Sequence, residues 1–502
     1  MLGFLIILIL ASSQSGQVNP DFSIGDGSSV TADGLMSKML LRTTADIFFK
    51  RTPMGTFQIR KGLDIKLKGQ AAKEIKTLPL SKTIAVAPCD YKGLKLRLSI
   101  KEGDAVKVGS QIFQDKFHPE IRILSPVSGR VAMIIRGEKR ALLRVIIETD
   151  GKQEQESFKK FNEHEILGLS QKDVTTYLLE GGLWPVIRQR PFSKIANHRN
   201  HPKAVFIHAM NTEPLALDVD VLLDKKEKEF QLGLDILKHL TKGEVHLCIH
   251  ARASAKALTE AKRVQIQRFS GPHPAGNVST HIQYVDPINK GDVVWYVEAQ
   301  DVLRVASLFM NGAYASERVV AITGEGAKNR YYARTCLGAP LSALVEDGGV
   351  NGLRYISGSV LTGKDVGKEG FLGFYDSQVT VIPEGGKREF LGWLSAGFNK
   401  FTVSKTFASA FLPEREVSLN TDKNGSDRAI VLNNIFDKYV ALDIMTFFLL
   451  RAVISGDIEE AEKLGILECD EEDFALCTFA CPSKTDVGEI MRSGLDLIEK
   501  EG

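Results

Sequence analysis

The sequence predicts an α+β multidomain protein. Three observations support this class: short β runs separated by Gly and Ser-Pro before residue 150, strands alternating with helices from 151 to 300, and helical periodicity in the final ~100 residues. A length of 502 residues is enough for about three or four domains. A hydrophobic content of 43% and a charged content of 25% are typical of a globular protein.

Residues 1–53 are expected to be a disordered extension, or to precede the true start of the protein. The apolar run 2–11 is shorter than the ~20 residues that a helix needs to cross a bilayer. No basic residue precedes this run, as one would in a secretory signal. Residues 14–34 are rich in Ser, Gly and Asp, which is typical of disorder. An uncleaved anchor or a signal peptide is the alternative.

Residues 54–150 are predicted to form a β-rich domain. Gly103-Asp104 and Gly109 favour tight turns, and Ser125-Pro126 favours a bend between the two halves. The phrases KEGDAVKVG (101–109) and SPVSGRV (125–131) resemble the barrel-sandwich hybrid of lipoyl and biotinyl carrier domains. The expected strands are 97–100, 111–113, 121–124, 131–135 and 142–148.

Lys116 is the nearest counterpart of the lysine that takes the cofactor at a hairpin tip of carrier domains. Its spacing to Gly129 is longer than in lipoyl domains, and the Met-Lys-Met of biotinyl domains is absent. We therefore expect a purely structural sandwich. A carrier domain modified at Lys116 is the alternative hypothesis.

The middle of the chain is predicted to hold two further domains. In residues 151–300, expected helices at 169–182 and 230–243 alternate with apolar strands at 204–210 and 244–250. This alternation favours a parallel sheet covered by helices. In residues 301–400, two strands and a short helix between 317 and 349 predict a β-grasp unit.

Residues 401–502 are predicted to form a helical domain. Helical periodicity is found in residues 427–457, 458–465 and 487–501. The apolar run 440–450 has the length of a buried helix and is too short to cross a membrane.

Composition and motifs exclude several functional classes. Lys+Arg 64 against Asp+Glu 62 leaves a net charge of +2, which argues against nucleic-acid binding through bulk charge. The chain contains no G-x-G-x-x-G or P-loop motif, no serine elbow and no H-E-x-x-H. We therefore assign no catalytic residue. Six cysteines without disulfide-like spacing favour a reducing compartment.

The densest group of polar and turn residues is FSGPHPAGNVSTHIQYVDP (269–287). It presents two imidazoles, and an imidazole can hydrogen-bond a quinone carbonyl or a phosphate and supply a proton near pH 7. A structural loop whose histidine caps its own backbone is the alternative. Two histidines without a fixed third ligand do not predict a metal site. The candidate quinone-binding residues are Gly271, His273, Gly276, His281 and Tyr284.

A partial iron–sulfur motif lies near the C-terminus, in LCTFACPSK (476–484). Cys477, Cys481 and Pro482 match the end of the ferredoxin run C-x2-C-x2-C-x3-C-P. Phe474 and Glu471 stand where the other two thiolates belong, and Cys469 is out of register. We expect a degenerate motif without metal. A cubane with Cys469 and a distant fourth ligand, or a cluster shared with a partner chain, are the alternatives.

Several motifs together resemble one family along nearly all of the chain after the extension. On them the chain is identified as a member of the NqrA family, which provides the A subunit of the sodium-translocating NADH:quinone reductase. The motifs are RKGLD (60–64), KEGDAVKVG (101–109), RGEKR (136–140), RQRPFSK (188–194), GPHPAG (271–276), THI (280–282), SGSVLTG (357–363), SDRA (426–429) and EEDFALCTFACP (471–482).

The resemblance implies a Rossmann-like α/β domain with a degenerate flavin/NADH site and an SLBB-like β-grasp domain. The family is similar to the C subunit of the Rnf complex and to the flavin-binding subunit of respiratory complex I. Where those relatives have a Gly-rich flavin loop, this chain has GGLWP (181–185), and where they have E-C-E-P it has NTEP (211–214). Bulky residues in such a loop keep backbone N–H groups away from a phosphate.

The resemblance also implies a function and a location. It implies a peripheral subunit on the cytoplasmic side of the inner membrane, in a complex that oxidises NADH, reduces ubiquinone and exports sodium. FAD, FMN, riboflavin and 2Fe-2S are then expected in other subunits, with the membrane-embedded B subunit as the chief partner and no cofactor in this chain. A soluble redox protein with its own flavin or iron–sulfur cluster is the alternative.

Overall fold

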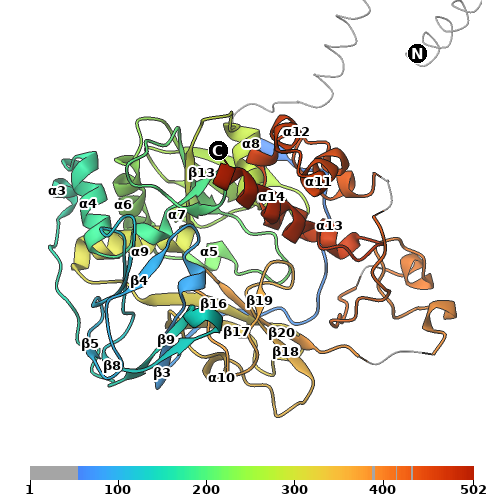
Figure 1. Cartoon of the computed structure of the whole chain (residues 1–502), viewed down its shortest axis with the longest axis horizontal. Coiled ribbons are helices and arrows are strands. Elements are labelled where there is room, and N and C mark those ends of the chain that lie inside the picture. The colour runs from blue at the N-terminus through green and yellow to red at the C-terminus, as the bar shows by residue number, and fades with distance from the viewer. Residues whose placement is uncertain (1–54, 387–389, 414, 431–433, 502) are drawn as a thin grey trace, which may run out of the picture. The chain divides into compact units, whose positions relative to one another are not determined.

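The computed structural model describes residues 55–501, apart from 387–389, 414 and 431–433. The predicted extension 1–53 therefore lies outside the described residues. Four β-sheets, two layers of helices and a C-terminal group of helices make up the described part (Figure 1). The predicted α+β multidomain class is confirmed.

The largest sheet has seven strands in the order β1-β14-β13-β12-β15-β10-β11. The first five strands in this order run parallel, while β10 and β11 pair antiparallel at one edge. Central strands buried on both faces read as continuous apolar runs, as in VFIHA and VHLCIH. The strands are β1 (Thr56–Gln58), β10 (Arg188–Arg190), β11 (Lys194–Ile195), β12 (Val205–Ala209), β13 (Val245–His250), β14 (Gln265–Ser270) and β15 (Val294–Glu298).

Helices connect and cover these strands. A capping box between Ser170 and Asp173 starts α4, and Gly312, in the left-handed conformation, ends α9. α9 packs on α6 and so continues the α/β layer beyond the predicted border at residue 300. The helices are α3 (Glu163–Leu167), α4 (Gln171–Glu180), α5 (Val219–Leu222), α6 (Glu227–Lys238), α7 (Lys256–Thr259), α8 (Val278–Val285) and α9 (Ala299–Asn311).

Two small antiparallel sheets face each other in the sandwich. One has the order β3-β9-β8-β5 and the other β4-β6-β7. Ile84, Ile112, Phe113, Val145 and Ile147 are fully buried and form the core between them. The strands are β3 (Thr83–Val86), β4 (Leu96–Leu98), β5 (Ala105–Val106), β6 (Gln111–Asp115), β7 (Arg122–Leu124), β8 (Gly129–Arg136) and β9 (Leu142–Thr149).

The β-grasp unit is a six-stranded sheet in the order β19-β18-β20-β16-β17-β2. Its outer strand β2 and the outer strand β1 of the large sheet both come from the segment 54–150. The strands of that segment are thus shared among three domains. The elements are β2 (Ala72–Thr77), β16 (Glu317–Thr323), β17 (Tyr331–Cys336), α10 (Leu341–Leu344), β18 (Leu353–Ser357), β19 (Lys364–Asp365) and β20 (Gln378–Pro383).

The C-terminal part is helical and has its own apolar core. The prediction of a helix over 427–457 is wrong for most of its length, because the α-helix begins only at Thr446. Val440, Ala441 and Leu442 are buried in succession, and three consecutive buried residues do not fit one face of a helix. The helices are η6 (Phe436–Lys438), α11 (Thr446–Ser455), α12 (Ile458–Lys463), η7 (Ile466–Glu468), η8 (Glu471–Phe474), α13 (Ala475–Ala480) and α14 (Val487–Glu501).

In the part of the chain that the structure describes, no helix combines the length and the apolar character that crossing a membrane requires.

Candidate functional site at the edge of the large sheet

The loop that follows β14 contains most of the predicted quinone-binding residues. It lies at the carboxyl end of a parallel strand, the edge where α/β sheets usually bind ligands. The loop after β12 ends at the same edge and touches it. The Gly276 N–H donates to Thr212 Oγ1 at 2.9 Å, and Thr212 Oγ1 lies 3.2 Å from His273 Nδ1. Residues 211–214 and 271–277 therefore form one hydrogen-bonded unit.

His273 is fixed inside this unit and is only 2% exposed. Its backbone N–H donates to Asp64 Oδ1 at 2.9 Å, which also ties the loop to the start of the described chain. Burial lowers the pKa of the imidazole, so the ring is neutral at pH 7. Nε2 of His273 is buried and has no hydrogen-bond partner among the described residues.

His208, on β12, links this loop to the next strand of the sheet. Its Nδ1 lies 2.7 Å from Glu298 Oε2 and its Nε2 lies 2.5 Å from the Gly276 carbonyl oxygen. Burial by itself would lower the pKa of His208, but the Glu298 carboxylate outweighs burial and raises that pKa to about 9. In turn, His208 and Arg188 lower the pKa of Glu298 to about 2, although burial acts in the opposite direction. Arg188 lies 3.0 Å from the Glu298 carboxylate. An imidazolium–carboxylate pair is therefore buried beneath the loop.

His281, on α8, lies against this pair and is 1% exposed. Its ring is 4.4 Å from the ring of Phe269 and 5.4 Å from that of His208, measured between centroids. Burial and the nearby His208 charge hold the pKa of His281 well below its usual value. Within the described part of the chain, its Nε2 has no partner. His273 and His281 are thus both neutral.

The two other predicted residues lie at the margins of the loop. Gly271 is exposed, and with φ +134° a Cβ there would be 2.2 Å from the Ile59 carbonyl oxygen, so a glycine is required for packing. Tyr284 is partly buried, and its hydroxyl donates to the Ala441 carbonyl at 3.5 Å. The structure therefore brings together His273, Gly276 and His281, but not all five residues.

A buried network of charges continues from the loop to the C-terminal helices. The Asn277 side-chain amide donates to Asp473 Oδ1 at 3.0 Å. Arg190, on β10, donates to Glu472 Oε1 at 2.7 Å and lies 3.3 Å from Asp470 Oδ2. Arg492, on α14, also pairs with Asp470. The acidic turn η8 is thus held between the large sheet and α14.

The pKa values of this turn diverge because its carboxylates have different partners. Burial raises the pKa of Glu472 to about 7, even though Arg190 acts in the opposite direction. Arg190 and Arg492 together outweigh burial at Asp470 and lower its pKa to about 2. Arg190 and Glu472 lie in motifs that carry the family resemblance, but nothing in their spacing indicates that they meet.

Thr212→Val is expected to destabilise the protein by about 1–3 kcal/mol, because it leaves the Gly276 N–H without its acceptor. The isosteric change keeps the packing, and urea unfolding measures the effect. Thr77→Val, exposed on β2, is the control and should change stability by less than about 0.5 kcal/mol. Equal effects of the two variants would contradict the role of Thr212 in joining the loops.

The segment at the position of a flavin loop does not fit a flavin. Trp184 is fully buried, donates from Nε1 to the Ala196 carbonyl at 2.7 Å, and stacks edge-on against Trp295 at 5.4 Å. A Cβ on Gly181 would meet Leu308, and one on Gly182 would meet Leu124. These glycines face apolar side chains and Trp184 fills the core, so backbone N–H groups are not presented to a phosphate.

The residues at the cluster motif do not fit an iron–sulfur cluster either. Cys469, Cys477 and Cys481 are buried in the apolar core of the C-terminal part. Burial raises the pKa values of Cys469 and Cys477, and of the four thiolate positions of the ferredoxin run only those of Cys477 and Cys481 hold cysteine. Phe474 is fully buried, and Glu471 pairs with Arg492 and Lys92. Both non-cysteine positions therefore have structural roles of their own.

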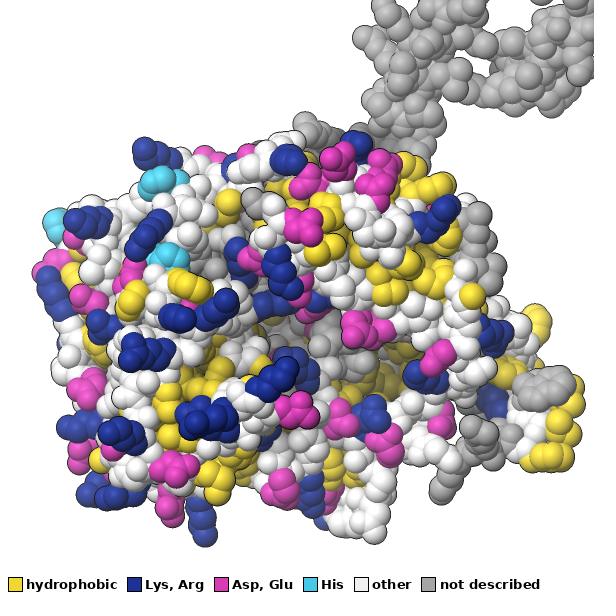
Figure 2. Space-filling model, in the orientation of Figure 1, with side chains coloured by type: hydrophobic (Ala, Val, Ile, Leu, Met, Phe, Trp, Pro, Cys, Tyr) yellow, Lys and Arg dark blue, Asp and Glu magenta, His cyan; other side chains and the backbone are white. Residues whose placement is uncertain are grey.

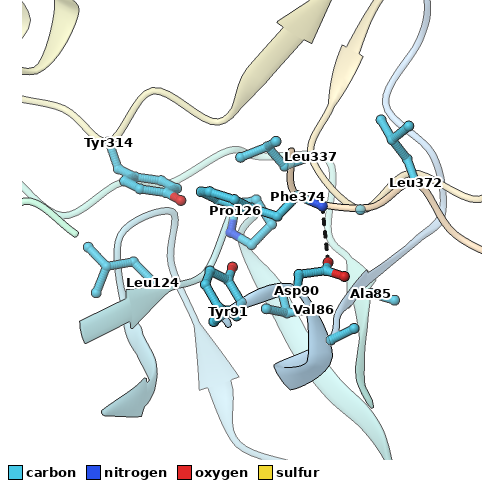
Figure 3. Close-up of a pocket in the computed structure, with 12 residues that line it drawn as sticks. Ala85, Val86, Asp90, Tyr91, Leu124, Pro126, Tyr314, Leu337, Leu372 and Phe374 are labelled. Atoms are coloured by element: carbon cyan, nitrogen blue, oxygen red, sulfur yellow. Dashed lines mark hydrogen bonds between the residues drawn. The ribbon is translucent and has the colours of Figure 1, made fainter. Parts of the chain in front are cut away.

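Two hollows lie away from the loop. Figure 3 shows a cavity of about 10 Å³ between the sandwich and the β-grasp sheet, where Asp90 accepts a hydrogen bond from the Phe374 N–H at 3.0 Å. It has room for about one water molecule and is too small for a quinone. A larger hollow of about 350 Å³ opens along α11 and is lined by Ile430, Phe447, Leu450, Arg451 and Ile454.

Three family models match successive parts of the chain. The NqrA N-terminal barrel-sandwich hybrid domain matches residues 57–150, the NqrA second alpha/beta domain matches 169–314, and the NQRA C-terminal domain matches 319–368. The second match ends shortly after α9. A solved NAD+-reducing [NiFe]-hydrogenase is similar to 44% of this chain and 47% of its own, with a TM-score of 0.29 and 15% identity.

Curated proteins match over their whole length. The A subunit of the Na(+)-translocating NADH-quinone reductase of Yersinia pseudotuberculosis serotype O:1b (strain IP 31758) is 39% identical over 447 residues, 89% of this chain and 100% of the relative. The Histophilus somni (strain 2336) protein of the same name is 40% identical over 448 residues, 88% of this chain and 99% of the relative. The chain therefore belongs to the NqrA family, the A subunits of the Na(+)-translocating NADH-quinone reductase.

Proposed function

We propose that this chain is the A subunit of a sodium-translocating NADH:ubiquinone reductase, which couples NADH oxidation and ubiquinone reduction to sodium export. The name that its full-length relatives share supports this assignment. Within the complex the chain serves mainly as a scaffold. Electrons pass through FAD, FMN, riboflavin and 2Fe-2S in the other subunits.

One observation carries the scaffold role: the positions that would hold redox groups are occupied by packed side chains. Trp184 fills the flavin-loop position, and Phe474 fills one cluster position, both without exposed surface. Opening either place for a cofactor would require removing a large buried side chain, at a cost of about 3–5 kcal/mol. The scaffold is therefore favoured over a redox protein with its own flavin or cluster.

The predicted quinone contact at residues 271–284 is part of the proposal. The support is chemical, since His273 and His281 are neutral imidazoles and each has a buried Nε2 without a partner in the described chain. A neutral ring with a free nitrogen can donate to a quinone carbonyl. Both rings are almost fully buried within this chain, so quinone would reach them only when the loop moves.

We also propose a peripheral position on the cytoplasmic side of the inner membrane, next to the membrane-embedded B subunit. Exposed apolar side chains on and beside α11 support a contact there, namely Met445, Phe448 and Ile454 at 59%, 54% and 56% exposure. They adjoin the hollow along α11, and hydrophobic side chains gather over this part of the surface (Figure 2). Large exposed apolar groups that cluster are typical of an interaction surface.

Two measurements test the function. Photo-crosslinking of the whole complex with an azido-quinone should label peptides from 269–287. Labelling confined to other proteins of the complex would remove the quinone contact and leave the scaffold role intact. The purified chain should contain neither flavin nor iron and acid-labile sulfide. Near-stoichiometric iron and sulfide, or a flavin absorbance spectrum, would overturn the scaffold role in favour of a redox protein.

A further inference from the structure

Three side chains with metal-binding groups meet where the sandwich touches the large α/β domain. His118 and Glu120 lie on the turn between β6 and β7, and His198 lies on the loop after β11. One ligand atom from each of these residues lies within 4.8 Å of the other two. His198 Nε2 is 2.8 Å from Glu120 Oε1, and the rings of His118 and His198 are 5.4 Å apart.

The turn that carries His118 and Glu120 has a fixed shape. Asp115 is 2% exposed and accepts from the backbone N–H groups of Lys95, Phe117 and His118, the closest of these bonds being 2.8 Å. This is the hairpin tip that also carries Lys116. The ligand-bearing side chains therefore project from a rigid turn, which lowers the entropy cost of binding an ion.

The loop that carries His198 is equally well held. The neighbouring Ala196 carbonyl accepts from Trp184 Nε1 at 2.7 Å, and the Asn197 N–H donates to Gln189 Oε1 at 3.0 Å. The His198 ring lies edge-on to the buried Trp184 ring at 6.1 Å. The His198 side chain is only 10% exposed. Its position is therefore set by the core of the α/β domain.

The nitrogens of these rings are incompletely used. Nδ1 of His118 is buried and has no hydrogen-bond partner in the described residues. The nitrogen that His198 offers to an ion is Nε2, which lies 2.8 Å from Glu120 Oε1. Two imidazoles and one carboxylate are a common ligand set for Zn²⁺, with the fourth position left to water.

We propose that His118, Glu120 and His198 form a binding site for a divalent transition-metal ion, Zn²⁺ by its ligand set. The ion joins the hairpin tip of the sandwich to the α/β domain. This site is independent of the proposed quinone contact and of the redox groups of the complex.

The geometry requires only a small adjustment. Zn²⁺ bonds of about 2.0–2.2 Å place tetrahedral ligand atoms roughly 3.4 Å apart. The His198–Glu120 pair, at 2.8 Å, has to open by about 0.6 Å. The third ligand atom, within 4.8 Å of the other two, has to approach by at most about 1.4 Å. Arg199 Nη2 donates to Glu120 Oε1 at 3.2 Å and competes with the ion, but its side chain is 65% exposed and can turn into solvent.

Titration of the tag-free full-length chain with Zn²⁺, by calorimetry, is expected to show one saturable site, and Co²⁺ should give the visible spectrum of a tetrahedral complex. His118→Ala and His198→Ala should each weaken binding by more than about 100-fold, because loss of outer-sphere partners alone costs about 10–100-fold. Glu120→Gln keeps the two rings in place and should also weaken binding. His164→Ala, an exposed histidine on α3, is the matched control and should bind as the unmodified chain does.

The absence of saturable binding would overturn the proposal. So would equal affinities in the unmodified chain, His118→Ala and Glu120→Gln, since that result means adventitious binding elsewhere. Unfolding curves of the metal-free variants separate loss of the site from loss of the fold. If His198→Ala fails to fold because its ring contacts Trp184, the other two variants decide the outcome.

Discussion

Arg190→Met is expected to destabilise the protein by about 3–5 kcal/mol, because it leaves buried carboxylates without their main counter-charge. The Arg190 side chain is 1% exposed and pairs with Asp470 and Glu472. Arg190 also acts on the neighbouring Asp473: burial raises the pKa of this carboxyl group, and the charge of Arg190 lowers it. Methionine has a similar length and apolar character but offers no charge. Without Arg190, the remaining positive charges near Asp470, Glu472 and Asp473 would be those of Arg492 and Arg188.

The loss should be largest where β10 meets the C-terminal helices. Limited proteolysis should release the region after residue 436 from Arg190→Met faster than from the unmodified chain, and urea unfolding should give the free-energy difference. Arg190→Lys should recover part of the stability, since it keeps the charge but not the forked geometry. The control is Arg354→Met, whose exposed pairs with Glu384 and Asp365 should contribute less than about 1 kcal/mol. Equal losses in the two methionine variants would contradict the role of Arg190.

His208→Gln is expected to cost about 3 kcal/mol near pH 6, and this cost should vanish at alkaline pH. The folded protein raises the pKa of His208 from 6.5 to about 9, mainly through Glu298 and against burial. The stabilisation is therefore fully present below pH 6.5, and it is lost as the pH rises through 9. The cost of the substitution should shrink across the same window.

Thermal and urea unfolding of both proteins between pH 6 and pH 9.5 measure this dependence. His164→Gln, exposed on α3, serves as the control and should give a difference near zero at every pH. Glu298 behaves in the opposite way, because its pKa is lowered from 4.5 to about 2. Its contribution is present above pH 4.5 and is lost as the pH falls towards 2. A cost of His208→Gln that does not change with pH would contradict a charged His208.

Short-range patterns predicted several elements correctly because each pattern reports a local preference. The alternation of apolar strands and helices gave β12, α6 and β13 close to their observed bounds, and Gly-punctuated runs gave the strands of the sandwich. The helix predicted over 427–457 failed because buried residues such as Val440 and Leu442 pack in a non-helical segment. Local apolarity does not reveal whether a segment is buried as helix or as irregular chain.

The order of strands along the chain does not predict which sheet each strand joins, for a similar reason. β1 and β2 follow each other near the start of the described chain, yet β1 pairs with β14 and β2 with β17. A strand completes whichever sheet edge offers hydrogen bonds and an apolar face, however distant that edge is in sequence. Such distant pairing partners leave no periodic signal in the strand itself.

Residue types at fixed short spacings were enough to identify the fold class and the family, and they predict the two degraded cofactor motifs. Trp184 in the flavin loop and Phe474 in the cluster run are visible in the chain alone. Which side chains meet is known from the three-dimensional fold alone. It buried His281 against His208, paired Arg190 with Glu472 across 282 positions, and brought His118 to His198. Buried ion pairs and the proposed metal site depend on contacts between residues far apart in the chain, and the spacing of residues within a short motif does not reveal such contacts.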